Sequence, residues 1–144
     1  MLKYNNLRTN KELIFIIVIG IVFYFNDYIS GKNTIYKNCK YPHRTQIYLF
    51  LHHLLSSFLK FGWIFNSKAV LKIYICSLIA VLIIQYIYTG CPSTFIINRN
   101  CELPRNTLLK DFLYLTGIKS SNYIYIYYLY IFISISIAYK KITN

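Results

Sequence analysis

Four apolar runs, separated by polar and basic segments, dominate the pattern of side chains along the chain. A membrane-spanning helix needs about 20 predominantly apolar residues, and each run reaches or approaches this length. The runs predict transmembrane helices over residues 13–29, 47–65, 71–88 and 123–139. We therefore expect an all-α membrane protein whose single domain, residues 1–144, contains about four transmembrane helices.

The first run is the shortest, and two interpretations of it remain open. Its strictly apolar part, residues 13–25, is about 20 Å long as a helix, so it spans only if it extends to Ile29 and Lys11 reaches toward the interface. The alternative is a cleaved signal peptide in which Lys3 and Lys11 belong to the basic segment. Tyr28 is bulky where cleavage requires a small residue, so a retained helix is favoured.

The last run contains an alternation that would indicate a β-strand in a soluble protein. Isoleucines occupy every second position from Ile131 to Ile137, which matches the period of a strand. An isolated strand cannot satisfy its backbone hydrogen bonds in lipid, and the chain offers no companion strands for a closed barrel. A helix is therefore predicted.

The segments between the runs differ in length and character. Residues 26–46 are polar and basic, contain glycine and proline, and are predicted to form a loop. Residues 66–68 leave room only for a tight turn, so the second and third runs are predicted to form an antiparallel hairpin. Within the longest connection, residues 89–122, an apolar helical face at 107–117 is too short to span, and we expect a short interfacial helix there.

Polar side chains in the second run follow one helical stripe. His53, Ser56, Ser57 and Lys60 have the spacing of a single face, and His52 lies on its flank. A charged lysine near mid-bilayer costs about 2.5 to 3.5 kcal/mol, so such residues usually face a protein interior or a cavity. Two interpretations stay open: a polar face that packs within the bundle while Lys60 extends to the nearer interface, and a path for protons or ions.

Composition and charge narrow the class of protein. Hydrophobic residues make up 56% of the chain and charged residues 14%, which excludes intrinsic disorder and argues against a soluble globule. The net charge of +12 comes from basic residues that lie mostly between the apolar runs. This placement favours anionic lipid headgroups as partners, and we expect no nucleic-acid partner. The basic residues divide almost equally between the two sides of a four-span topology, so no orientation is predicted.

Residues for catalysis or metal binding are scarce. His52 and His53 are adjacent and point about 100° apart on a helix, so they cannot chelate together. Metal-binding motifs of the HExxH and CxxC types do not occur, and four acidic residues leave little from which to build an active site. We expect no enzymatic activity, no metal and no cofactor.

Two of the four cysteines are predicted to form a disulfide. Cys91 and Cys101 lie ten positions apart, and the polar residues 98–100 between them can supply a turn. Closing so short a loop would restrict the unfolded chain by about 3 kcal/mol. The alternative is two reduced thiols in a reducing cytosol. Cys76 lies within an apolar run and is interpreted as a small buried hydrophobe.

About half of the chain carries a family resemblance. Its motifs are HHLLSSFLKFGWIF from His52 to Phe65, Cys91-x-x-Thr94, Asn98-x-x-Cys101, and KDFLYLTGIK from Lys110 to Lys119. This segment resembles small multi-pass membrane proteins of giant nucleocytoplasmic DNA viruses, mimivirus-like and phycodnavirus-like. It departs from their pattern at Gln85-Tyr86, where a His-Trp pair is commoner. No function is established for that family, so the resemblance implies a viral source and a topology but no activity.

These observations lead to two functional hypotheses. The favoured one is a non-enzymatic integral membrane protein with a structural role in a virion inner membrane or a virus-remodelled host membrane, alone, as a homo-oligomer or with other membrane proteins. The alternative is a small proton or ion conductor, or an oligomeric pore, lined by His52, His53, Ser57 and Lys60. An enzyme acting on lipid or thiol stays open because the absence of a motif is weak evidence.

Overall fold

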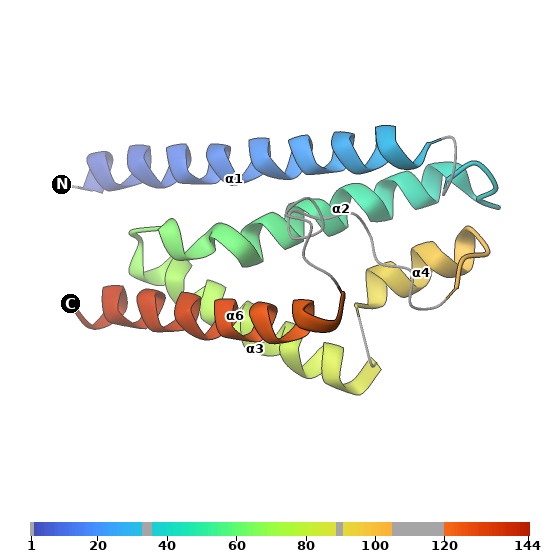
Figure 1. Cartoon of the computed structure of the whole chain (residues 1–144). Coiled ribbons are helices and arrows are strands. Elements are labelled where there is room, and N and C mark those ends of the chain that lie inside the picture. The colour runs from blue at the N-terminus through green and yellow to red at the C-terminus, as the bar shows by residue number, and fades with distance from the viewer. Residues whose placement is uncertain (1, 33–35, 89–90, 105–119) are drawn as a thin grey trace.

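The structure is a computed structural model that describes residues 2–32, 36–88, 91–104 and 120–144 (Figure 1). All regular secondary structure in these ranges is helical, as the apolar runs predicted. The elements are α1 (Leu2–Gly31), α2 (Pro42–Phe61), the short 3-10 helix η1 (Gly62–Ile64), α3 (Lys68–Tyr88), α4 (Pro92–Asn100) and α6 (Ser120–Thr143). The predicted interfacial helix at residues 107–117 lies outside the described residues.

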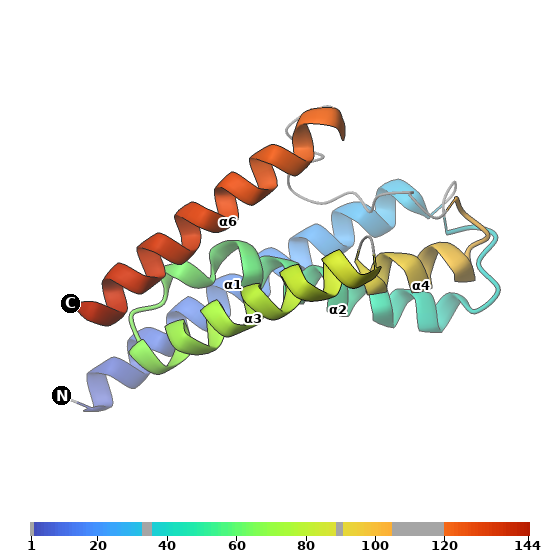
Figure 2. The same cartoon turned by 90° about the horizontal axis from the view of Figure 1, so that it is seen from below.

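The helices form an elongated bundle in which α1 packs antiparallel along α2 (Figure 1). Both termini lie at one end of this bundle, whereas α4 and the α1–α2 connection lie at the other (Figure 1). On the other side of α2, α6 contacts α3 and η1. From the end of the bundle that holds the termini, α6 and α3 diverge toward the end at which α4 lies (Figure 2). The predicted antiparallel hairpin of the second and third runs is present as α2 and α3.

The turn between α2 and α3 is held by side chains from distant parts of the chain. The Tyr74 hydroxyl donates a hydrogen bond to the Leu59 carbonyl at 3.0 Å. The Lys141 ammonium near the end of α6 lies 2.9 Å from the Trp63 carbonyl and 3.3 Å from the Phe65 carbonyl. A cation is favourable here because carbonyl groups at a helix end lack intrahelical partners. The C-terminal helix thus stabilises the end of the α2–η1 segment.

Among the described residues, three helical segments are long and apolar enough to cross a membrane: Thr9–Gly31, Pro42–Ile64 and Lys68–Tyr88. Large apolar side chains on them are exposed, for example Ile14 at 60% and Ile73 at 61%. Polar and charged side chains, in contrast, are found in the interior. The fourth predicted run, residues 123–139, falls within helix α6.

Helix boundaries differ from the sequence prediction, most of all at the start of α1, which begins at Leu2 rather than at residue 13. Residues 26–46 were predicted to form a loop, but α1 continues to Gly31 and α2 begins at Pro42. The polar pair Asn26-Asp27 does not end α1, because the Asp27 side chain is fully buried against α2 rather than in water. The longest connection also contains α4, which begins with Pro92 at its first helical turn, where the missing backbone N–H of proline costs nothing.

Candidate functional site

One face of α2 is buried and largely polar, and it faces α1 and α4. Its buried residues are Thr45, Leu49, His53, Ser57 and Lys60. They follow one another at intervals of three or four residues, so they lie on one side of the helix. Two members of the predicted stripe are not part of this buried face, since His52 and Ser56 are half-buried.

The centre of the site is a pair of titratable side chains between α1 and α2. His53 Nε2 lies 3.0 Å from Asp27 Oδ2, and both side chains are 0% exposed. Nothing in the sequence connects these residues, because Asp27 falls at the end of the predicted first helix, where the polar segment begins. A buried carboxylate is strongly disfavoured without a partner, so the pair explains how an acidic residue is tolerated in an apolar helix.

Helices α1 and α2 approach each other closely at Gly20. A Cβ atom added at Gly20 of α1 would lie 2.8 Å from Leu54 Cδ2 and 3.2 Å from Leu54 Cα. The Leu54 methyl group is the end of a flexible side chain and can move, but the Leu54 Cα leaves little room for a larger residue at this position. The two helices are thus closely packed at Gly20, and Asp27, which contacts His53, lies two turns further along α1.

The pair does not use all of its hydrogen-bonding capacity. Within the described part of the chain, Asp27 Oδ1, His53 Nδ1 and Ser57 Oγ are buried without a hydrogen-bond partner. Each such atom costs about 1 to 3 kcal/mol unless water or a ligand reaches it. One of these atoms belongs to α1, and the other two belong to residues four positions apart on α2.

Lys60 continues the polar face toward the other end of α2. Its side chain is only 6% exposed, and its ammonium lies 6.0 Å from the centre of the Phe23 ring. This cation–π geometry stabilises a partly desolvated ammonium. The Lys60 side chain is therefore buried within the bundle.

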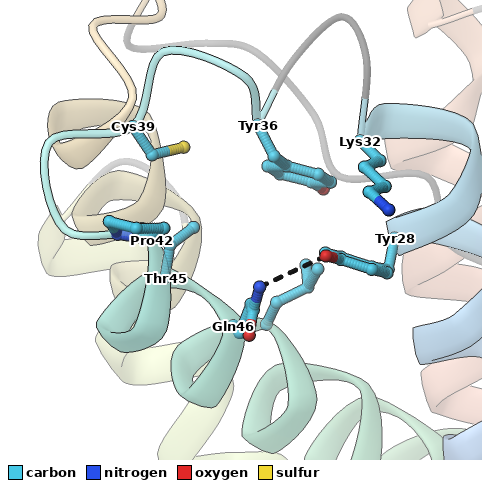
Figure 3. Close-up of a pocket in the computed structure, with 8 residues that line it drawn as sticks. Tyr28, Lys32, Tyr36, Cys39, Pro42, Thr45 and Gln46 are labelled. Atoms are coloured by element: carbon cyan, nitrogen blue, oxygen red, sulfur yellow. Dashed lines mark hydrogen bonds between the residues drawn. The ribbon is translucent and has the colours of Figure 1, made fainter.

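A cavity of about 110 Å³ opens between the end of α1 and the start of α2 (Figure 3). It is lined by Tyr28, Lys32, Tyr36, Cys39, Pro42, Thr45, Gln46 and Leu49. The Gln46 amide donates a hydrogen bond to the Tyr28 hydroxyl at 3.3 Å (Figure 3). Burial, and then the nearby Asp27 carboxylate, raise the pKa of Tyr36 far above its ordinary value, so this phenol stays protonated. The cavity thus adjoins the Asp27 end of the polar face.

The disulfide of the protein differs from the predicted one. Cys101 forms a disulfide with Cys39, which lies 62 positions earlier in the sequence, and Cys91 is a free cysteine. The predicted Cys91–Cys101 bridge is wrong because α4 separates the two residues by about 15 Å, whereas a disulfide joins Cα atoms less than about 7 Å apart. Beside the bridge, the Lys40 amide donates to the Asn100 carbonyl at 2.8 Å, so the α1–α2 connection is fastened to the end of α4.

His52 has a different partner from the rest of the predicted stripe. Its Nδ1 lies 3.7 Å from the Cys91 sulfur. Burial alone would raise the pKa of the Cys91 thiol, but the hydrogen bond and charge of His52, with contacts to Thr94, lower it from 9.0 to about 6. Positions 52 and 91 share no sequence pattern, so only packing of α4 against α2 reveals the pair.

Metal binding has no support in the geometry. In the ranges that the structure describes, no three His, Cys, Asp or Glu side chains come together as a set that could hold a metal ion. His52 contacts Cys91, whereas His53 contacts Asp27.

The resemblance to viral membrane proteins rests on sequence motifs alone, because no protein-family model, curated protein or solved structure matches this chain.

Proposed function

We propose that the protein is a multi-pass integral membrane protein with a structural, non-enzymatic role. The observation that carries this proposal is the distribution of side chains on its helices. Large apolar residues such as Val22, Leu51 and Ile83 are more than half exposed, whereas Asp27 and His53 are fully buried. A water-soluble helical bundle has the opposite distribution. On the resemblance described above, the membrane is a virion inner membrane or a host membrane remodelled by infection.

Membrane fractionation tests this proposal. We expect the protein to remain in the membrane pellet after washes with alkaline carbonate and with high salt, and to be released by detergent. The physical reason is that three apolar spans cannot leave the hydrocarbon without exposing their surface to water. Release of the protein by carbonate would contradict integral insertion.

Proton conduction is a second candidate function, favoured by the buried Asp27–His53 pair. Intramembrane titratable residues usually belong to ion or proton paths. His53, Ser57 and Lys60 continue from this pair along one side of α2. Because α1 of the same chain covers this side, the geometry supports a path within one protomer better than a pore lined between several copies.

Reconstituted vesicles containing a pH-sensitive dye test this second function. If the protein conducts protons, His53→Leu should reduce the proton flux at least tenfold, because it removes the proton-accepting ring from the middle of the path. His43→Leu is the matched control, since His43 is exposed at the start of α2. Absence of flux in the unaltered protein would reject conduction and leave the structural role.

A further inference from the structure

The Cys91 thiol occupies a defined position at the start of α4. Cys91 is the residue that precedes Pro92 and the first turn, and its carbonyl accepts a hydrogen bond from the Phe95 amide at 3.1 Å. Its side chain is half-buried, so it is held in place and still reachable. Because α3 ends at Tyr88, the thiol lies just beyond a candidate membrane span.

The neighbour of this thiol is a base. His52 Nδ1 lies 3.7 Å from the Cys91 sulfur, within the distance of a hydrogen bond to sulfur. An imidazole in this position accepts the thiol proton and then stabilises the thiolate as its counter-ion. The amino end of α4 adds a favourable dipole for negative charge. Burial opposes ionisation, but His52 and Thr94 outweigh it and lower the pKa of Cys91 to about 6.

The surroundings indicate which electrophile such a thiolate would meet. The Cys39–Cys101 disulfide lies at the far end of the same helix, α4. Disulfides persist in oxidising compartments, where small disulfides are also present. The protein's own bridge is not within reach, because α4 separates Cys91 from Cys101 by about 15 Å and Cys101 is only 3% exposed.

We propose that Cys91 and His52 form a thiol–disulfide exchange site for low-molecular-weight disulfides, of which glutathione disulfide is the probe. His52 takes the thiol proton, and the Cys91 thiolate attacks one sulfur of the disulfide. A new bond forms between Cys91 and that sulfur, the old sulfur–sulfur bond breaks, and the second half leaves as a thiolate that accepts the proton from His52. One thiol and one disulfide are present before and after the step, so no further oxidant is needed.

The test uses the full chain in detergent, with its Cys39–Cys101 bridge intact. Glutathione disulfide is added, and non-reducing peptide mass spectrometry follows the mixed disulfide at Cys91 over time. We expect His52→Gln to slow its formation on the order of tenfold at pH 6, since a large loss of thiolate is partly offset by the greater nucleophilicity of a more basic thiolate. The slowing should disappear at about pH 7.5 to 8, above which the more basic thiolate of the variant reacts faster. His43→Gln is the matched control, and it should leave the rate unchanged.

A second measurement keeps the proposal testable if His52→Gln does not fold. The rate of Cys91 alkylation in the unaltered protein is measured against pH, with the Cys39–Cys101 peptide as the check on folding. We expect half of the maximal rate near pH 6, the value to which His52 lowers the Cys91 pKa. A half-maximal rate near pH 9, or a Cys91 that alkylates but forms no mixed disulfide with glutathione disulfide, would overturn the proposal.

Discussion

Replacing Asp27 alone by alanine is expected to lower the free energy of unfolding by about 3 to 5 kcal/mol, because it leaves the buried His53 ring without its partner. His53→Leu alone should be similarly costly, since it leaves a buried carboxyl group whose second oxygen already has no hydrogen-bond partner. The double variant Asp27→Ala/His53→Leu should recover most of this loss, because it removes both polar groups from the apolar helix interface.

Denaturant titration in detergent micelles measures these differences as a double-mutant cycle. Ser136→Ala is the control, because Ser136 is exposed on α6 and its hydroxyl bonds only to the Phe132 carbonyl of its own helix. It should change the unfolding free energy by less than about 0.5 kcal/mol. If the two single losses simply added in the double variant, Asp27 and His53 would not be coupled, and the pair at the centre of the site would be wrong.

The second large effect is expected from the disulfide. Cys39→Ser should destabilise the protein by up to about 4 kcal/mol, because the bridge closes a loop of 62 positions and so restricts the unfolded chain. Cys76→Ser is the matched control, since Cys76 is a free cysteine on α3 whose side chain is exposed, not buried as its apolar run predicted. Non-reducing peptide mapping identifies the bridge directly. A peptide that links Cys91 to Cys101 would contradict the pairing.

The same bridge leads to an orientation, which the distribution of basic residues did not provide. Disulfides form on the oxidising side of a membrane. Because both termini lie at the end of the bundle opposite α4 and the α1–α2 connection (Figure 1), they are expected on the reducing side. Acceptor sites for glycosylation placed near Cys39 should therefore be modified, whereas sites added at either terminus should not.

The sequence predicted the helices well because lipid imposes a simple requirement on them. Each span must present apolar side chains over about 20 residues, and that requirement is visible without any knowledge of packing. The end of α1 was predicted at residue 29, two residues before the observed end at Gly31. The partner of Asp27 was not predicted, although its contact with His53 is what makes this carboxylate compatible with a buried helix. A partner 26 positions away leaves no local signal.

The cysteines show more clearly that the sequence does not reveal contacts between residues far apart in the chain. Sequence proximity favoured Cys91 and Cys101, which share one connection, over a bridge to Cys39 that closes a much longer loop. Loop length, however, changes closure entropy only slowly. The helix that begins at Pro92 holds Cys91 and Cys101 apart and so excludes a disulfide between them. Proline is common in the first turn of a helix, so Pro92 was the feature of the sequence that indicated α4.

Within the polar stripe, periodicity grouped the residues but could not assign their contacts. His53, Ser57 and Lys60 do lie on one buried face of α2. His52 has a different role from its neighbour, because adjacent residues on a helix diverge by about 100° and His52 therefore reaches α4 rather than α1. Which element lies on each side of α2 is a property of the tertiary structure.

Chain order determines when the disulfide can form during biosynthesis. On the proposed orientation, Cys39 reaches the oxidising compartment first and Cys101 follows 62 residues later, a delay of about 3 to 12 s at translation rates of about 5 to 20 residues per second. Cys91 arrives in between, so a thiol that is not the native partner reaches this compartment before Cys101 does. Docking of α4 on α2 holds Cys91 beside His52 and brings Cys101 to Cys39. In the folded chain, the nine residues of α4 therefore keep Cys91 at one end of the helix and place Cys101 beside Cys39 at the other.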